Sequence, residues 1–538
     1  MMTNTYTPIV GGLEKSIQTF SDSFRARGHE VKIVAPAFPD MPENEKDVVR
    51  VPSIEKFIST DFSVTLPLPE LLQSLVADFK PDIVHSHHPF LMGDLALRLC
   101  GQNKIPLVFT YHTMFEHYTD HFAMDNLAMQ KFVVELATGY AKMADQVIVP
   151  SESVGRILEE RKVKRPIAVV PTGIDVERFA GGSGDFRASH GIPKNAFVVG
   201  HTGRLAPEKN LPFLTEAAAE FLKRSKTSHF LVVGRGPSER EMKKIFRAWG
   251  VLGRVHFAGV QKGKALVAAY HAMDVFAFAS KSETQGIVIA EAMAAGLPVV
   301  GLDANGVREV VRDKKNGRLL ALESRSKFSA ALEWCAGRTK TQWEEVRAEA
   351  LKTAKEFSVD VCAGKALAVY EKVLLQYKEG SGSRWRQWGG LIGRFKTELD
   401  MLLNLGRAAG SALVNTAVAP KQPKDVIGQL YQKQIEKFRE EWMELLLKIR
   451  REARDIPEDE RKRLDDVSET VTQKIRTYES EMTELYRRVL NSGEDFEKFM
   501  AGANQQMYRE FEKVNAAPSG KPIISLILPG VKTQEPSR

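Results

Sequence analysis

The chain has 538 residues, of which 43% are apolar and 27% are charged, and its formal net charge is +8. This composition is that of a folded globular protein and excludes a largely disordered chain. The three cysteines are too few and too far apart for a disulfide framework or a cysteine-based zinc site, so we expect a reducing, cytoplasmic environment. No apolar run reaches the roughly 18 residues of a membrane-spanning helix, and the first residues do not have the pattern of a signal peptide.

Short β-branched runs alternate with longer amphipathic stretches between residues 30 and 300. This alternation predicts parallel strands that are covered by helices on both faces of a sheet. The first series of predicted strands is 30–35, 83–85, 107–111, 146–149 and 167–170, and the second is 197–202, 229–233, 255–258, 275–279 and 298–302. Helices are predicted between them, for example at 12–27, 211–225 and 239–248.

A polar, glycine-rich tract at 173–189 separates the two series. We therefore expect an α/β fold with two Rossmann-like, doubly wound domains that face a cleft. The domains are predicted at 1–172 and 173–360, with a helix at 361–379 that crosses back to the first domain. The first strand must precede the Gly11-Gly12 turn, where only about ten residues are available. Either this strand is very short or the chain begins upstream of Met1, and we favour the second explanation.

The most specific signal is the segment SKSETQGIVIAEAMAAGLP at 280–298. Glu283 falls in the loop after a predicted strand, and Glu291 is expected nearly two turns into the helix that Gly286 and Ile287 open. Free backbone N–H groups at a helix start attract an anion. A carboxylate on each side of such a pocket suits a phosphorylated sugar, with one acid for sugar hydroxyls and one for a ribose. An ordinary helix with acidic residues would explain the two glutamates but not the whole string.

Two further turns follow predicted strands. The loop GRLAPEKN at 203–210 places Arg204 and Lys209 five residues apart, and two such cations can hold two phosphates from opposite sides. A solvated basic loop is an equally good explanation of this loop alone. Gly234, in the turn GRGP, can lie beneath a nucleotide base, although the turn lacks the third glycine of a dinucleotide fingerprint.

The paired glycines Gly11 and Gly12 precede a predicted helix. Glycines in this place let a backbone approach a phosphate or a sugar closely. A plain tight turn explains the pair equally well.

Taken in order, the segments GGLE, PTGID, GRLAPEKN, GRGP and ETQGIVIAE resemble those of the retaining GT-B glycosyltransferases with the E-x7-E motif, a glycogen-synthase- and mannosyltransferase-like superfamily. The resemblance covers roughly residues 5–375. The segments HSHHPF at 85–90 and TYHTMFEHY at 110–118 look like those of bacterial diacylglycerol glucosyltransferases, which use UDP-glucose.

The resemblance implies a role for each matching residue. Glu291 would hold the nucleotide ribose, with Gly234, Gly286 and Ile287 beside the nucleotide. Glu283 would meet the donor sugar. Arg204 and Lys209 would bind the diphosphate, and Gly11 and Gly12 would cap it from the first domain. His112 would contact the donor sugar.

Breaking a sugar–phosphate bond builds negative charge on the leaving diphosphate, which must be neutralised. The sequence holds no Asp-x-Asp pair of the kind that carries a metal in many transferases. Arg204, Lys209 and a helix start can do this work instead, so we expect no metal and no cofactor. No residue is nominated as a nucleophile for a double displacement, and we therefore favour a front-face route through an oxocarbenium-like ion pair.

Six of the twelve histidines lie between residues 85 and 121, and the spacing of His112, His117 and His121 permits a metal site on one helix face. Because the stretch reads as a strand end and a loop, we prefer substrate contact for His112 to metal binding. The other histidines are expected in an acceptor pocket or at the surface.

The composition changes after residue 379, and 380–538 is predicted to be a helical extension. Tryptophans, arginines and aliphatic residues at 384–403 suit an anionic membrane surface, although packing on the protein's own surface is as good an explanation.

The sequence thus predicts a hexosyltransferase that moves a sugar, most simply from UDP-glucose, to a lipid or glycan acceptor, as a cytoplasmic enzyme at the inner face of a membrane and without a nucleic acid partner. Three alternatives stay open: a mannosyltransferase that uses GDP-mannose, a sugar-phosphate phosphorylase, and a non-catalytic scaffold that acts through its helical tail. The oligomeric state is left open.

Overall fold

The computed structural model describes residues 1–9, 11–38, 40–42, 45–51, 53–54, 64–65, 77–114, 127–182 and 185–379, together with Thr397, Met401 and Asn404. The chain divides into two compact units. The larger consists of Met1–Ala96, Pro106–His117 and Ala144–Gly382, and the smaller of Leu97–Ile105, Tyr118–Met143 and Ser383–Arg538. In the smaller unit, the side chain of Asn404 donates a hydrogen bond of 2.9 Å to the carbonyl of Leu136 in α4 (Leu127–Met143). All predicted site residues belong to the larger unit.

The first part of the larger unit is built on parallel strands. One ladder joins β1 to β2, and another has the order β5-β6-β7-β8. Met2 forms parallel bridges to both Val34 and Ser86, so it connects the two ladders between β1 and β5. The first strand is therefore present as a very short one. The strands are β1 (Ile33–Pro36), β2 (Val48–Val51), β5 (Val84–Ser86), β6 (Leu107–Thr110), β7 (Gln146–Val149) and β8 (Ile167–Val169), with a separate antiparallel pair, β3 (Ser53–Ile54) and β4 (Val64–Thr65).

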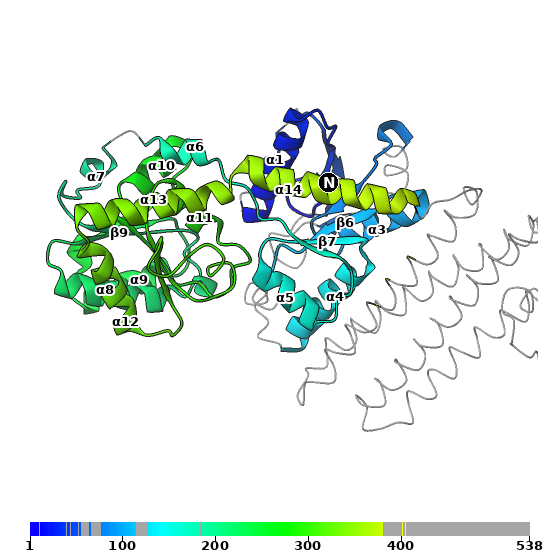
Figure 1. Ribbon diagram of the computed structural model, residues 1–538. Helices are drawn as coiled ribbons and strands as arrows, with labels where there is room; N and C mark the ends of the chain where they lie inside the picture. Colours follow the sequence, from blue (N-terminus) through cyan, green and yellow to red (C-terminus); the bar gives the residue numbers. More distant parts are fainter. Residues whose placement is uncertain are drawn as a thin grey trace, which may run out of the picture. The chain divides into compact units, whose positions relative to one another are not determined.

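Two helices that are far apart in the sequence pack together in this part (Figure 1). Phe20 and Phe24 of α1 (Gly12–Ala26) share a buried cluster with Cys362, Ala366 and other residues of α14 (Val359–Glu379). The chain thus returns to its first domain after completing the second. Another helix, α3 (Met92–Asn103), follows β5, and α5 (Glu152–Glu160) packs on β7 and β8.

The second part of the larger unit holds a six-stranded parallel sheet of order β11-β10-β9-β12-β13-β14. One face is covered by α8, α9 and α12 and the other by α6, α10, α11 and α13, each over its own buried apolar cluster. The strands are β9 (Val198–Thr202), β10 (His229–Val233), β11 (Val255–Gly259), β12 (Val275–Phe278), β13 (Val299–Leu302) and β14 (Gly317–Leu320). The helices are α6 (Val176–Ala180), α7 (Phe186–Ser189), α8 (Leu211–Arg224), α9 (Glu239–Ala248), α10 (Gly263–His271), α11 (Ile287–Ala294), α12 (Arg325–Ala336) and α13 (Lys340–Glu356).

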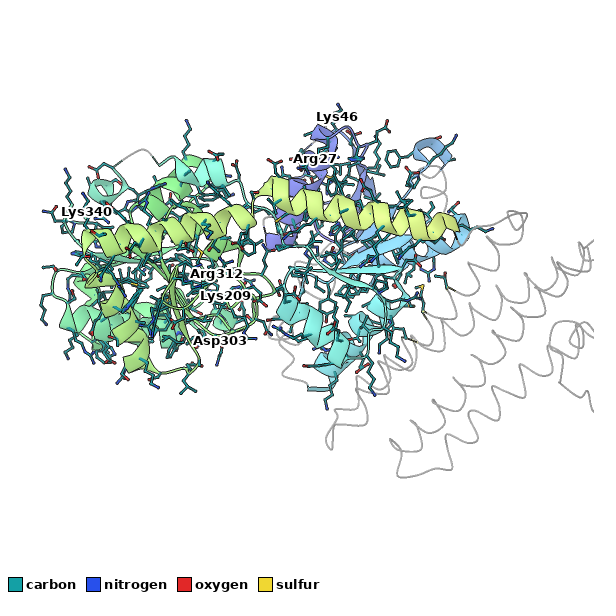
Figure 2. The ribbon with its side chains drawn as sticks, viewed as in Figure 1. Arg27, Lys46, Lys209, Asp303, Arg312 and Lys340 are labelled. Atoms are coloured by element: carbon teal, nitrogen blue, oxygen red, sulfur yellow. The ribbon has the colours of Figure 1, made fainter. Side chains whose placement is uncertain are left out.

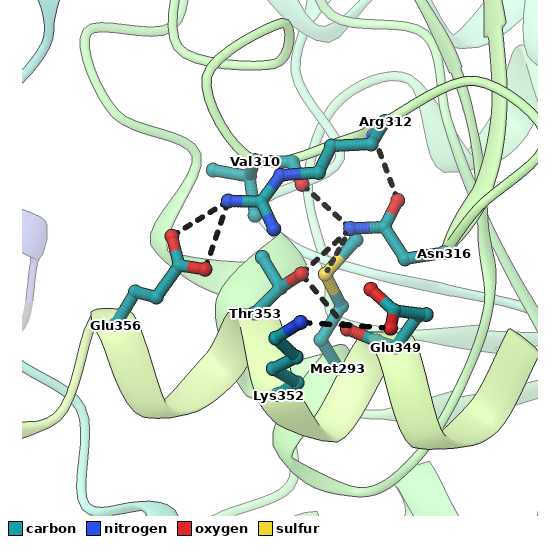
Figure 3. Close-up of polar contacts among 8 residues, drawn as sticks. All are labelled: Met293, Val310, Arg312, Asn316, Glu349, Lys352, Thr353 and Glu356. Carbon is teal, nitrogen blue, oxygen red and sulfur yellow. Dashed lines mark hydrogen bonds and ion pairs between the residues drawn. The ribbon is translucent and has the colours of Figure 1, made fainter.

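A buried asparagine fixes α13 to this domain (Figure 3). Asn316 donates to the carbonyl of Val310 at 2.9 Å and to Thr353 Oγ1 of α13 at 3.0 Å, and its own oxygen accepts from the amide of Arg312 at 2.7 Å. The Arg312 guanidinium lies 2.6 Å from a carboxylate oxygen of Glu356 near the end of α13. Satisfying every polar group of a buried asparagine makes the position of this helix specific.

The chain crosses between the two domains at two adjacent places. Ile174 forms a parallel bridge with Ser358, with the Ile174 amide 2.8 Å from the carbonyl of Phe357. A Cβ atom on Gly173 would lie 2.5 Å from the Cα of Val359, so the two crossing segments touch backbone to backbone.

The predicted α/β architecture with two Rossmann-like domains is confirmed, and all ten predicted strands are present with shifts of up to three residues at their ends. The sequence reading missed β2, β3, β4 and β14. Of these, β3 and β4 have only two residues each, and β14 is an edge strand whose residues, GRLL, are not β-branched. The predicted helical extension lies outside the described residues, apart from three positions. None of the helices in the described ranges is long and apolar enough to cross a membrane.

Candidate functional site

The site residues gather at the carboxyl ends of neighbouring strands. In the six-stranded sheet the order of the strands reverses between β9 and β12, and such switch points are where open α/β sheets bind ligands. The loop after β9 carries Arg204 and Lys209, and the loop after β12 carries Glu283. The turn with Gly11 and Gly12 follows Met2, which lies at the corresponding reversal between β1 and β5.

The loop after β12 leads into α11 through a glycine with a left-handed backbone. Gly286 has φ +71° and caps α11, and a Cβ atom on it would lie 3.0 Å from the carbonyl oxygen of Gly306. The helix begins at Ile287, so Glu291 lies just over one turn into it. The expectation of nearly two turns is wrong because four residues separate Ile287 from Glu291, and at about 3.6 residues per turn they make only about 1.1 turns. The first backbone N–H groups of α11 are those at Ile287 and Val288, which is where the sequence predicts that an anion binds.

Glu291 is almost fully buried, with 4% of its surface exposed, and both of its oxygens have partners. Tyr270 of α10 donates a hydrogen bond of 3.0 Å to Oε2, and Lys15 of α1 donates to Oε1. Burial and the neighbouring Glu291 carboxylate raise the pKa of Tyr270 well above its usual value, so the hydroxyl keeps its proton. The sequence reading missed both partners. Lys15 follows directly on the segment GGLE, which places it near the site but does not identify its partner, and nothing in the sequence distinguishes Tyr270.

Lys209 and Glu283 form an ion pair, with Nζ 2.6 Å from Oε1 (Lys209 is labelled in Figure 2). Lys209 ends the 3-10 turn Pro207–Lys209, and the next residue, Asn210, has a left-handed backbone at φ +52°. Arg204, by contrast, is half exposed and lies 2.6 Å from Glu208. The structure therefore brings Lys209 to Glu283, and it places Arg204 at the start of the same loop beside a different carboxylate.

The glycine turns pack closely against one another. A Cβ atom on Gly234 would lie 1.9 Å from the carbonyl oxygen of Gly203, and the backbone of Gly234 has φ +137°. Only glycine fits there, which brings the turns after β9 and β10 together at one edge of the sheet. Gly12 of the first domain lies close to the start of α11, since a Cβ atom on it would be 3.6 Å from Cδ1 of Ile287.

A second contact between the domains adjoins the loop after β12. The buried carboxamide of Gln285 accepts from the amide of Thr172 at 2.6 Å and donates to the carbonyl of Thr172 at 2.8 Å. The Thr172 hydroxyl donates to Ser16 Oγ of α1 at 2.9 Å. Gln285 of the second domain is therefore bound to Thr172, which is bound in turn to Ser16 in the first domain. The sequence reading missed this role of Gln285.

His112 lies just after β6, and its Nε2 is 2.9 Å from Nδ1 of His87. Burial lowers the pKa of His112 to about 3 and that of His87 well below its usual range, so both rings are neutral at pH 7. His88 has a different partner, because its Nδ1 accepts a hydrogen bond of 3.1 Å from the amide of Asn4. His85, His87 and His88 are all buried, so of the two places expected for the other histidines, the surface is wrong for these three.

His117 and His121, the other members of the possible metal motif, lie outside the described residues. Within the ranges that the structure describes, no three His, Cys, Asp or Glu side chains lie together as metal ligands. The amphipathic segment at 384–403 also lies outside these ranges, apart from Thr397 and Met401.

Comparison with known proteins shows the family of this chain. The family described as Glycosyltransferase Family 4 matches residues 10–178, and the family described as Glycosyl transferases group 1 matches residues 183–342. An alpha-monoglucosyldiacylglycerol synthase from Streptococcus pneumoniae is 29% identical over 59% of this chain and 74% of its own length. A GDP-mannose-dependent alpha-mannosyltransferase from Mycobacterium tuberculosis is 28% identical over 60% of this chain and 82% of its own.

The same fold occurs in the Anabaena protein HepE, which was solved in complex with UDP. That structure is 20% identical, covers 69% of this chain and 98% of its own, and superimposes with a TM-score of 0.55. The fold, the site and the two family matches define an enzyme that transfers sugars. The chain belongs to the GT-B glycosyltransferases and, among them, resembles the bacterial diacylglycerol glucosyltransferases.

Proposed function

We propose that this glycosyltransferase moves glucose from UDP-glucose to a membrane lipid of the diacylglycerol type, with retention of the anomeric configuration and without a metal ion. As a member of its family the enzyme takes a nucleotide-sugar donor. Similarity to a relative that is named for the synthesis of alpha-monoglucosyldiacylglycerol supports the choice of glucose and of the acceptor. The UDP in the structure of HepE, which has the same fold, supports a uridine nucleotide.

The observation that carries the proposal is the arrangement of charges around the start of α11. Glu291 is held by Lys15 and Tyr270 on one side, and Glu283 is held by Lys209 on the other. A carboxylate has about four lone-pair positions, so two hydrogen bonds leave room for the two hydroxyls of a ribose on Glu291. The free N–H groups of α11 between these carboxylates then face the diphosphate.

The remaining roles follow from charge and position. Lys209 and Arg204 neutralise the diphosphate, and the close approach of Gly12 to Ile287 lets the turn with Gly11 cap it. Glu283 accepts hydrogen bonds from the hydroxyls of the donor sugar. The Lys209 ammonium lies 2.6 Å from Glu283, and the negative charge of this carboxylate stabilises the positive charge that develops at the anomeric carbon.

Transfer then takes place on one face of the sugar. The bond between the anomeric carbon and the diphosphate oxygen breaks first, and its electron pair stays on that oxygen. The acceptor hydroxyl attacks the resulting oxocarbenium-like carbon from the same face, and its proton passes to the departing phosphate oxygen. The protein cations stabilise the charge that accumulates on the leaving group.

GDP-mannose is the second candidate donor, because relatives that use it are almost as similar to this chain. A direct comparison decides between the two donors. Purified full-length protein is incubated with UDP-glucose or GDP-mannose, with and without vesicles of diacylglycerol and anionic phospholipid, and release of the nucleoside diphosphate is followed. We expect UDP release that depends on diacylglycerol, and an α-linked product by NMR. Release of GDP alone, a β-linked product, or no release above that of the Glu283→Gln variant would overturn the proposal.

A lipid acceptor also requires contact with a membrane. Arg384, Arg386 and Arg394 would each contribute about 1 kcal/mol near anionic lipid, while Trp385 and Trp388 would enter the interface. We expect the protein to sediment with anionic vesicles at low salt, and salt or the Trp385→Ala/Trp388→Ala double substitution to weaken this binding. A protein that stays in the supernatant at low salt would contradict the membrane role.

A further inference from the structure

Three histidine rings form a continuous row at the carboxyl ends of β5 and β6. The ring centroids of His85 and His87 are 4.1 Å apart, and those of His87 and His112 are 5.2 Å apart with the planes at 25°. We call these three residues the histidine row. The pairing of β5 with β6 brings His85 opposite Val108, so the row runs across two strands that are adjacent in the sheet and distant in the sequence.

The inner end of the row is held by two hydroxyl groups. Nε2 of His85 lies 2.7 Å from Thr110 Oγ1, and its Nδ1 lies 2.6 Å from the hydroxyl of Tyr370 in α14. The Tyr370 ring packs edge-on against Phe24 of α1, with centroids 5.5 Å apart. Because both nitrogens of His85 have partners on opposite sides, its ring cannot turn without losing a buried hydrogen bond. His85 thus provides a fixed surface on which His87 stacks.

The outer end of the row is the contact between His87 and His112. His87 is 2% exposed, and its Nε2 has no hydrogen-bond partner among the described residues. The contact of 2.9 Å between its Nδ1 and His112 Nε2 is therefore the one hydrogen bond that the described residues give this ring. A phenyl ring would stack on His85 equally well. Stacking alone does not account for an imidazole at position 87, whereas the bond to His112 does.

We infer that His87 is a positioning residue for sugar transfer, which holds the His112 ring so that its Nδ1 is the nitrogen presented to the donor sugar. This inference rests on the proposed role of His112. Both rings are neutral, so a single proton lies between Nδ1 of His87 and Nε2 of His112, and Nε2 of His112 is occupied on the buried side. Without His87, the His112 ring can rotate about its side-chain bonds. A displacement of about 1 Å at a reacting group is enough to lower a rate by about a hundredfold.

Four variants of the full-length protein test this inference: His87→Phe, His87→Asn, His112→Ala and the His87→Phe/His112→Ala double variant. Phenylalanine keeps the ring stack and removes the hydrogen bond. Asparagine loses the ring but places an amide group near the position of Nδ1, where it can bond to His112. For each variant kcat, the KM for UDP-glucose and the thermal denaturation midpoint are measured.

We expect His87→Phe to lower kcat by about 10- to 100-fold with less than about a threefold change in KM, because the bound ring loses its orientation. We expect His87→Asn to recover kcat to within about threefold of the wild-type value. In the His112→Ala background, His87→Phe should cause no further loss, since the residue that it orients is already absent.

Four outcomes would overturn the inference. If His112→Ala is inactive but His87→Phe keeps more than half of the wild-type kcat, the positioning role of His87 is refuted. The proposed role of His112 then stays intact. A further loss in the double variant, or an equal loss in His87→Asn and His87→Phe, would show a structural role. Full activity of His112→Ala would instead refute the role of His112 in the proposed function, and this inference with it.

Discussion

Replacing Lys209 by methionine tests whether protein charge stabilises the leaving diphosphate. Methionine keeps most of the hydrocarbon stem and removes the ammonium group, which lies 2.6 Å from Glu283 in a pair whose side chains are only 23% and 17% exposed. The variant therefore loses a cation from the site and leaves the Glu283 carboxylate unpaired. Removing one preorganised charge from a transition state costs about 3 kcal/mol. Since about 1.4 kcal/mol corresponds to a tenfold change in rate, kcat/KM should fall by about 100- to 200-fold.

The chain offers a matched control in the loop after β12. Lys281 also pairs with a glutamate, Glu323, but the two side chains are 59% and 35% exposed. An exposed ion pair contributes at most about 1 kcal/mol, so Lys281→Met should keep kcat/KM within about twofold of the wild-type value. Both variants are assayed by release of UDP from UDP-glucose with diacylglycerol vesicles. If Lys209→Met keeps more than a tenth of the wild-type kcat/KM, the assignment of this lysine to the diphosphate is wrong.

Three other predictions concern nucleotide binding, metal independence and acid stability. Glu291→Gln should weaken UDP binding, since an amide replaces only part of the acceptor capacity of a carboxylate, whereas Glu283→Gln should mainly lower kcat; equal losses of affinity in calorimetric titrations would show that the two roles are wrong. Excess EDTA should change the rate by less than about twofold, because Lys209 and Arg204 supply the positive charge; a complete loss that manganese or zinc restores would support the metal reading of the histidines. Burial lowers the pKa of His201 from 6.5 to about 4, so its contribution to stability is present above pH 6.5 and is lost as the pH falls toward 4. Between pH 6.5 and 4.5 the free energy of unfolding should drop by about 2 to 3 kcal/mol on account of this residue; urea denaturation of His201→Asn should show a correspondingly smaller drop, and an unchanged drop would contradict the assignment.

The strands could be predicted from the sequence because those of a parallel sheet are buried on both faces. The run FLVV in β10 and the run VFAF at β12 are continuous apolar segments between helical patterns. The very short first strand was the alternative that we did not favour, because it exists through the two neighbours of Met2 and has no pattern of its own. The edge strand β14 was missed for a related reason, since an edge position demands less apolar character.

The site could be predicted in part. Glu283 and Glu291 lie in one string of sequence, so their positions around the start of α11 could be read directly. The partner of Glu291 could not, because Lys15 is 276 positions away and meets it only through the packing of two domains. Tyr270 lies in an ordinary amphipathic helix, and no local pattern distinguishes it from a core tyrosine.

The histidines show the same limit more sharply. The sequence suggests grouping His112 with His117 and His121, which follow it at helical spacing. The structure instead joins His112 to His87, because β5 and β6 are neighbours in a parallel sheet. Which strands become neighbours in the sheet is not specified by the residue pattern within either strand, so the contact could not be predicted.

The two adjacent crossings between the domains make the second domain an insertion with its ends together. Ile174 enters the domain and Phe357 leaves it, with the amide of one 2.8 Å from the carbonyl of the other. A segment whose ends meet in this way can be exchanged as a cassette, since a replacement has to match only one short bridge. A chimera in which residues 174–357 are replaced by the matching segment of a GDP-mannose-dependent relative should therefore fold. It would also separate the choice of donor from the choice of acceptor, which the surrounding domain would retain.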